Sequence, residues 1–206
     1  MRRIGLLGGT FDPPHVGHLW LATLARDALD LERVLVIPAA QPPHKLGVPM
    51  SPVEDRVALV RAAIADDPAL ELSMIDAERP GPSYTVDLVD ELRARLPAGV
   101  EPILVMAADS LAGILAGVWR DPDGLLARLE WAVGPRPGAD PPDRRALDAR
   151  FGAAASRIHL LEAPSLDVSA SEIRARVAAG RAIRYLVPRR VEEEISARGL
   201  YRGATS

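Results

Sequence analysis

The sequence of 206 residues contains no cysteine, and this absence removes whole classes of chemistry. Without thiols there is no disulfide framework, no thiolate metal site and no cysteine nucleophile, so any such chemistry must use His, Asp, Glu, Ser or Lys. The chain also lacks an apolar run near the roughly 20 residues that span a bilayer. Its start, "MRRIGLLGGTFDP", reaches glycine and aspartate too early for a secretory signal. We therefore expect a cytoplasmic protein without a membrane segment.

An excess of positive charge is missing as well. The formal net charge is −3, whereas proteins that coat nucleic acid need a dominant basic field, so nucleic acid is not an expected partner. No repeat or low-complexity tract interrupts the chain, and its length suits one domain with a substantial core. We predict a single domain over residues 1–206, with a small helical subdomain from about residue 165 to 206. The composition leaves a homo-oligomer open.

Short apolar segments alternate with segments of helical periodicity, which indicates an α/β fold. The strand candidates are nearly continuous in apolar character, as strands buried on both faces of a parallel sheet are. They are residues 4–7, 34–38, 70–75, 103–106, 131–133 and 158–161. We predict a Rossmann-like, doubly wound parallel sheet with helices on both faces, in which ligands bind beyond the carboxyl ends of the strands.

Capping signals predict where two of the helices begin. A capping box that starts at Ser51, with proline at the first helical position, predicts a helix over residues 52–65. A second box starts at Ser169 and opens a helix that Gly180 ends. Both helices follow loops on the side of the sheet where ligands are expected.

The stretch "GGTFDPPHVGH", residues 8–18, follows the first predicted strand and holds two of the four histidines. His15 and His18 are three residues apart at a helix start, so they share one face beside amides that the helix leaves unpaired. Those amides and the positive end of the helix dipole favour an anion. The stretch matches neither the G-x-G-x-x-G nor the G-x-x-x-x-G-K-[ST] fingerprint. Two imidazoles without further clustered ligands predict no metal held by the protein.

The H-x-G-H segment in this context resembles the signature of the nucleotidylyltransferase superfamily, whose imidazoles contact the phosphates of a nucleoside triphosphate. A second stretch, "VSASEIR" at residues 168–174, resembles that superfamily's serine-rich turn before isoleucine and arginine. Ala170 and Ser171 replace the usual serine and threonine there. The stretch is also a plain helix cap, and both interpretations hold because a capped helix start binds phosphate, with Arg174 able to reach a second anion.

Further stretches resemble bacterial nicotinate-mononucleotide adenylyltransferases, over essentially the whole chain from Ile4 to Tyr201. They are "IPAAQPPHK" (37–45), "GPSYTVDLVDEL" (81–92), "VMAADSL" (105–111), "RPG" (136–138) and "YLVPRRVEEEISARGLY" (185–201). The resemblance implies transfer of the adenylyl group of ATP to nicotinate mononucleotide, giving deamido-NAD (nicotinate adenine dinucleotide) and pyrophosphate in NAD biosynthesis. It also implies Mg²⁺ that arrives on the ATP phosphates without a protein cage.

The resemblance assigns site residues as well. Those implied to be catalytic, by aligning phosphates and neutralising their charge, are His15, His18, Lys45 and Arg174. The ATP-binding set shares His15, His18 and Arg174 with these and adds Gly8, Gly9, Thr10, Phe11, Arg136, Ser169 and Ser171. The set for nicotinate mononucleotide is Lys45, Tyr84, Thr85, Asp109 and Trp119, with Trp119 stacked on the nicotinate ring.

Two features depart from the family pattern. Ala107 stands where the family has glycine in G-x-D, and the interval from Asp109 to Trp119 is longer than usual, which indicates an insertion. Two alternatives stay open: a related transferase, such as phosphopantetheine adenylyltransferase or a cytidylyltransferase, and a non-catalytic nucleotide sensor on the same scaffold. The first usually lacks the "PSYT" stretch. The second is expected to lose charged phosphate contacts first, whereas this chain keeps its histidines, Lys45 and Arg174.

Overall fold

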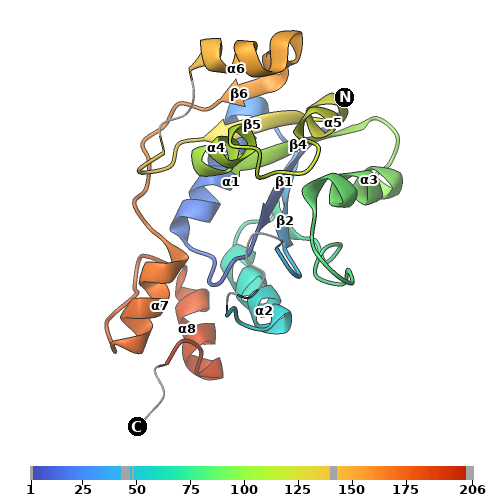
Figure 1. Ribbon diagram of the computed structural model, residues 1–206. Coiled ribbons are helices and arrows are strands. Elements are labelled where there is room, and N and C mark those ends of the chain that lie inside the picture. Colours follow the sequence, from blue (N-terminus) through green and yellow to red (C-terminus); the bar gives the residue numbers. More distant parts are fainter. Residues whose placement is uncertain (1, 43–46, 48, 140–142, 203–206) are drawn as a thin grey trace.

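The computed structural model describes residues 2–42, 47, 49–139 and 143–202, and a parallel β-sheet forms its centre (Figure 1). The strands within these residues are β1 Arg2–Gly9, β2 Arg33–Pro38, β3 Leu70–Leu72, β4 Val100–Ala107, β5 Glu130–Gly134 and β6 Ile158–Leu160. Their order is β3-β2-β1-β4-β5-β6, and every neighbouring pair is parallel. The chain winds outward from β1 to β3 and then returns to β4 on the other side of β1. The predicted doubly wound sheet is confirmed.

Helices cover both faces of the sheet (Figure 1). They are α1 Val16–Leu29, α2 Val53–Ile64, α3 Thr85–Arg95, α4 Ala108–Leu115, α5 Pro122–Arg128, α6 Arg144–Phe151, the 3-10 helix η2 Gly152–Arg157, α7 Ala170–Ala178 and α8 Arg189–Arg198. Successive strand residues enter opposite cores: Leu6 packs with α3 to α6, and Leu7 packs with α1, α2, α7 and α8. None of the helices in the described ranges is long and apolar enough to cross a membrane.

The third strand is shorter than the sequence predicts. The apolar pattern extends it to residue 75, but β3 ends at Leu72. After Ser73 the backbone turns, and the N–H of Glu78 donates to the carbonyl of Met74 at 3.0 Å. Ile75 is buried although it lies in this turn. A buried residue outside regular structure therefore extended the apolar pattern past the end of the strand.

The start of α2 also differs from the prediction. Its N-cap is Pro52, and no side-chain hydrogen bond caps the helix, so the predicted capping box at Ser51 is wrong. The backbone of Ser51 is engaged elsewhere. Its N–H donates to Asp12 Oδ2 at 3.1 Å, and its carbonyl accepts from Arg56 Nε at 3.0 Å. Contacts with a distant loop thus place Ser51 outside the helix.

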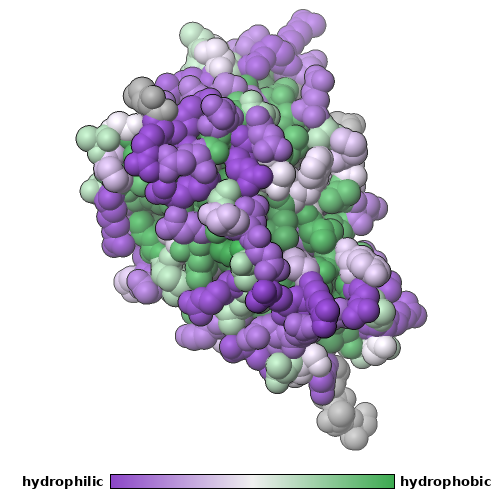
Figure 2. Space-filling view, turned by 180° about the vertical axis from the view of Figure 1, so that it is seen from behind, coloured by the Kyte–Doolittle hydropathy of each residue, from purple (hydrophilic) through white to green (hydrophobic). Residues whose placement is uncertain are grey.

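The C-terminal helices α7 and α8 lie together below the sheet, near α2 (Figure 1). Ile173 of α7 and Val191 of α8 belong to the same apolar core as Ala22 of α1 and Val60 of α2. Seen from behind, the surface is mostly hydrophilic, with hydrophobic side chains visible across its middle (Figure 2). Because α7 and α8 share a core with the first helices, they bring the two signature stretches of the sequence near one another.

Candidate active site

A cavity of about 580 Å³ lies beyond the carboxyl ends of β1 and β4, where the strand order changes direction. The ends of these strands, residues 7–9 and 104–107, contribute to its wall. The predicted site residues within the described ranges all line this cavity: Gly8, Gly9, Thr10, Phe11, His15, His18, Tyr84, Thr85, Asp109, Trp119, Arg136, Ser169, Ser171 and Arg174. Lys45 lies outside the described residues.

The loop between β1 and α1 has a conformation that depends on a buried aromatic ring. Phe11 is 2% exposed and has a positive φ of 51°. A Cβ at Gly9 would lie 2.9 Å from Phe11 Cζ, which is closer than packed carbon atoms approach. Gly9 is therefore needed so that the Phe11 ring can lie beneath the turn.

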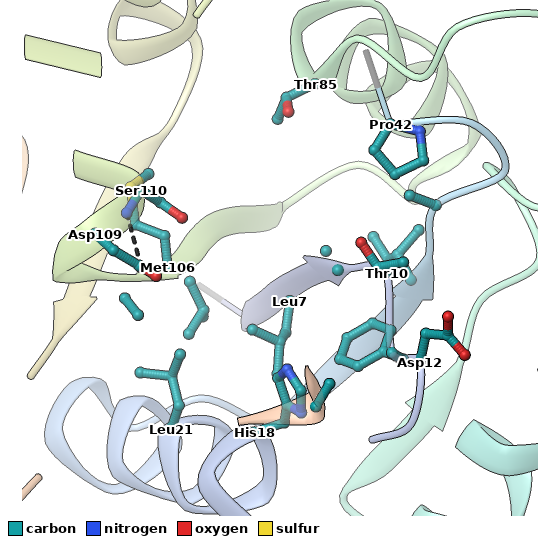
Figure 3. Close-up of a pocket in the computed structure, with 18 of the residues that line it drawn as sticks. Leu7, Thr10, Asp12, His18, Leu21, Pro42, Thr85, Met106, Asp109 and Ser110 are labelled. Carbon is teal, nitrogen blue, oxygen red and sulfur yellow. Dashed lines mark hydrogen bonds between the residues drawn. The ribbon is translucent and has the colours of Figure 1, made fainter. Parts of the chain in front are cut away.

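The two histidines of H-x-G-H are stacked at the start of α1. Their ring centroids are 3.7 Å apart, and the ring planes meet at 28°. His18 Nδ1 accepts a hydrogen bond from the backbone N–H of His15 at 3.1 Å, so the neutral imidazole of His18 carries its proton on Nε2. Figure 3 shows this ring at the start of α1, among the residues that line the cavity. The helix start thus fixes both the position and the tautomer of His18.

Gly17, the glycine of H-x-G-H, lies against the segment that precedes α7. A Cβ at this position would be 3.0 Å from Val168 Cγ1 and 3.1 Å from His15 Nδ1. The missing side chain therefore lets the H-x-G-H turn pack directly on the start of the "VSASEIR" stretch. The two signatures are about 150 residues apart in sequence and meet at one end of the cavity.

His15 is buried and neutral at pH 7. Its side chain is 3% exposed, and within the described part of the chain its Nδ1 has no hydrogen-bond partner. Burial, assisted by the positive charge of Arg136, lowers the pKa of His15 to about 4. His15 therefore meets an incoming anion as a neutral hydrogen-bonding group, and its environment can supply charge through Arg136.

The burial of His15 should make the stability of the fold depend on pH. Because the pKa of His15 falls from 6.5 to about 4 on folding, the unfolded chain binds more protons between these values. Stability is therefore lost as the pH falls through this window, and the His15 contribution is about 3 kcal/mol. We expect urea unfolding of the wild type and of His15→Gln to diverge: the variant should lose less stability between pH 6.5 and pH 4. Parallel curves for both proteins would contradict the assignment.

Arg56, which sequence reasoning missed, ties the loops around the cavity together. It is 1% exposed on the buried side of α2. Its guanidinium donates to the backbone carbonyls of Thr10 at 2.9 Å, Ala39 at 2.7 Å, Ala40 at 3.1 Å and Ser51 at 3.0 Å. A charged residue on the apolar face of a predicted helix is the sequence signal that could have revealed it.

Asp12 is a second buried anchor of the β1–α1 loop, and it is 4% exposed. Its Oδ1 accepts from the hydroxyl of Tyr201 at 2.7 Å, and its carbonyl oxygen accepts from Arg174 Nη1 at 2.6 Å. Burial and the bond to Asp12 raise the pKa of Tyr201, so the phenol remains a donor. A residue 189 positions away thus helps to fix the loop that carries His15.

The start of α7 forms one wall of the cavity at the end where the H-x-G-H turn lies. This end, with its helix starts and arginines, is called the phosphate end below. Ser169 Oγ accepts from the N–H of Glu172 at 3.2 Å and lies 3.2 Å from Ser171 Oγ. The predicted cap at Ser169 is therefore confirmed, and Gly180, with φ of 65°, follows the helix as predicted. Helix N–H groups and two hydroxyls meet the cavity here, beside Arg174.

Arg136 links α4 to the segment before α7. Its Nη1 donates to the carbonyl of Val168 at 3.3 Å, and its Nε lies 3.6 Å from Asp109 Oδ2. The same guanidinium is near enough to His15 to help lower its pKa. Arg136 therefore adds positive charge to the wall that also contains the H-x-G-H helix start.

The other end of the cavity is bordered by the start of α3 and the turn after α4. Tyr84 is the N-cap of α3, Thr85 is its first residue, and both line the cavity. After α4 the chain turns through Gly117, which has φ of 77°, and the N–H of Val118 donates to Gly113 at 3.0 Å. Trp119 follows this turn and lines the cavity, so the longer interval noted in the sequence still delivers an indole to it.

Ala107 requires no strain in place of the usual glycine. It is the N-cap of α4, with φ of −90° and ψ of 163°, a conformation that any residue adopts. The alanine adds a methyl group at the cavity wall next to Met106. The departure from the family pattern therefore leaves the backbone path intact.

Ser83 connects the "PSYT" stretch to the loop after β2. Its N–H donates to the Gln41 carbonyl at 2.9 Å, and its Oγ accepts from the Gln41 N–H at 3.1 Å. Asp76 is 2% exposed beneath this contact, and its carboxyl is hydrogen-bonded to Ser83. Burial raises the pKa of Asp76 above its usual range. These contacts hold Tyr84 and Thr85 against the neighbouring loop.

The fold and the cavity together define a nucleotidylyltransferase. A family model described as cytidylyltransferase-like matches residues 6–176. A probable nicotinate-nucleotide adenylyltransferase of Thermomicrobium roseum is 43% identical over 202 residues, covering 98% of this chain and 92% of that protein. The probable nicotinate-nucleotide adenylyltransferase of a Roseiflexus species is 46% identical over 200 residues, covering 97% and 98%. The chain belongs to the cytidylyltransferase-like family and, within it, to the nicotinate-nucleotide adenylyltransferases.

A solved structure of similar fold is nicotinic acid mononucleotide adenylyltransferase of Plasmodium falciparum, in complex with NaAD. Its TM-score is 0.78 at 17% identity, and the match covers 98% of each chain. A putative nicotinate-nucleotide adenylyltransferase of Vibrio parahaemolyticus has a TM-score of 0.67 at 18% identity. At these identities the likeness concerns the fold alone.

Proposed function

We propose that this protein transfers the adenylyl group of ATP to nicotinate mononucleotide, giving deamido-NAD and pyrophosphate. The observation that carries the proposal is that one cavity has two ends of different chemical character. One end combines the H-x-G-H helix start with the start of α7 and two arginines, which suits a triphosphate. The other end combines Tyr84, Thr85 and Trp119, which suits an aromatic ring with a polar substituent. The relatives' names agree with this pairing.

The reaction joins two anions, so its difficulty is electrostatic. The 5′-phosphate of the mononucleotide has a second pKa near ~6 and is largely dianionic at pH 7, so it needs no general base. Its oxygen bonds to the α-phosphorus of ATP while the bond to the bridging oxygen of pyrophosphate breaks. Catalysis then consists of holding the two phosphates in line and stabilising charge on the leaving group.

The residues at the phosphate end divide this work. His15 is neutral, so it contributes hydrogen bonding, and His18 Nε2–H offers a donor whose tautomer is set by the His15 amide. Positive charge comes from Arg136 and Arg174, and from Lys45 as implied by the family resemblance. The amides of α1 and α7 add fixed dipoles that need no rearrangement during the reaction.

Magnesium would enter on the nucleotide. In the described ranges no three His, Asp or Glu side chains gather as a metal site, and the donors at the phosphate end are imidazoles, guanidinia and hydroxyls. This donor set fits an ion whose ligands are phosphate oxygens and water. When bound, Mg²⁺ neutralises charge on the phosphates. The protein's own groups then bind and orient the Mg²⁺-nucleotide complex.

Pyrophosphate release tests the proposal directly. ATP and Mg²⁺ are supplied with nicotinate mononucleotide, nicotinamide mononucleotide or phosphopantetheine in parallel reactions, with a reaction without acceptor as the control. We expect rapid release with nicotinate mononucleotide and little without acceptor. A preference for phosphopantetheine would show that the end of the cavity bordered by Tyr84 does not bind the nicotinate ring. ATP binding without release for any acceptor would favour the nucleotide sensor.

A further inference from the structure

Arg120 borders the cavity beside Tyr84 and Trp119. Its guanidinium carbon lies 5.0 Å from the centroid of the Tyr84 ring, within the range of a cation–π contact. Its Nη1 lies 3.5 Å from Asp87 Oδ2, and the Arg120 side chain is 60% exposed. The aromatic face and the carboxylate thus hold a guanidinium at the mouth of this end of the cavity.

This guanidinium differs in position from the other arginines that line the described cavity. Arg136 donates to the carbonyl of Val168 and lies near His15, and Arg174 donates to the carbonyl of Asp12, so both belong to the phosphate end. The lining near Tyr84 is otherwise made of neutral or apolar groups, apart from the Asp76 carboxyl, which is buried against Ser83. Arg120 therefore supplies positive charge where the phosphate-binding groups do not.

We propose that Arg120 makes the enzyme select the acid form of the mononucleotide, by pairing its guanidinium with the carboxylate on the pyridine ring. This inference rests on the proposed function. Of the five N–H donors of Arg120, the described residues engage one, with Asp87. A ring carboxylate carries a full negative charge and accepts two parallel N–H bonds, whereas a carboxamide is neutral and presents its own N–H₂ group to the donors. Tyr84, Trp119 and Arg120 line the same end of the cavity, so a pyridine ring bound between the aromatic side chains has the guanidinium within reach of its substituent.

The test compares the two acceptors in three proteins: the wild type, Arg120→Gln and Arg95→Gln. Arg95 is an exposed arginine on α3 that pairs with Glu91 and does not line the cavity, so it is a matched control. The readouts are kcat/KM for each mononucleotide at saturating ATP, KM for ATP, and Kd for each mononucleotide from tryptophan fluorescence. We expect Arg120→Gln to lower the acid-to-amide ratio of kcat/KM by about 10- to 100-fold, through KM for the acid. KM for ATP and all values for Arg95→Gln should match the wild type.

Two results would overturn the role of Arg120. An unchanged acid-to-amide ratio in Arg120→Gln would show that the guanidinium does not discriminate. An equal loss for both acceptors would show that Arg120 only supports the Tyr84 ring. Failure of the proposed function is a separate result, seen as a wild type that turns over neither mononucleotide. The ratio of the two Kd values then decides the role of Arg120 by the same criteria.

Discussion

The variant His18→Ala should lose turnover by about 100- to 1,000-fold, the cost of removing one donor aimed at a developing negative charge. The expectation follows from the position of the ring at the start of α1 and from its tautomer, which the amide of His15 fixes through Nδ1. Folding should be little affected, because the lost acceptor at the helix start costs about 1 kcal/mol. Steady-state pyrophosphate release gives kcat, and thermal unfolding gives the change in stability.

Two further variants separate catalysis from capping. Asn in His18→Asn can keep an acceptor near the position of Nδ1 for the His15 amide but lacks a donor at Nε2, so it should fold like the wild type and remain slow. His159 pairs with Glu130 at 2.9 Å and does not line the cavity, so His159→Ala should keep full turnover. Wild-type turnover in His18→Ala, or recovery of turnover in His18→Asn, would count against the donor role.

Loss of Arg56 should cost more stability than loss of Arg61, the second arginine of α2. In Arg56→Leu the four backbone carbonyls that Arg56 now serves lose their donor. A buried carbonyl left without a donor costs about 1–3 kcal/mol; these four are only partly buried and can gain water, so we expect the free energy of unfolding to fall by about 3–5 kcal/mol in total. Urea denaturation measures this difference.

Arg61 provides the control, since it is an exposed arginine in the last turn of the same helix. Arg61→Leu should change the free energy of unfolding by less than about 0.5 kcal/mol. Similar losses in the two variants would mean that the carbonyls around Arg56 find other partners. Weakened ATP binding in Arg56→Leu at a temperature where it is still folded would further indicate that the loops around the cavity have moved.

The strands could be predicted from the sequence because burial on both faces leaves a continuous apolar run in each of them. The start of α7 could be predicted as well, because its cap is a hydrogen bond between Ser169 and Glu172, which are three positions apart. The cap at the start of α2 could not be predicted, because the N–H of Ser51 is bonded to Asp12, which is 39 positions away in the sequence. Local chemistry was therefore sufficient wherever the partners are neighbours in sequence.

The same distinction applies to the site. The two histidines of H-x-G-H were enough to predict a helix start that binds an anion. In the structure, the site residues implied by the family resemblance and lying in the described ranges all line one cavity. Neutral His15 and the bond from Tyr201 to Asp12 could not be foreseen, because burial and long-range partners are set by tertiary packing. The protonation state of a side chain such as His15 could therefore be assigned only once its surroundings in the folded protein were known.

The bond between Asp12 and Tyr201 also orders events during synthesis. The ribosome makes Asp12 early, and the phenol that completes its surroundings follows only after another 189 residues. Helix α1 can form in the meantime because its backbone hydrogen bonds are local, whereas β1 is completed only when β2 and β4 pair with it. The histidine loop, however, gains this hydrogen bond only when Tyr201 has emerged. A growing chain therefore carries its nucleotide signature long before it can hold that loop in its final shape.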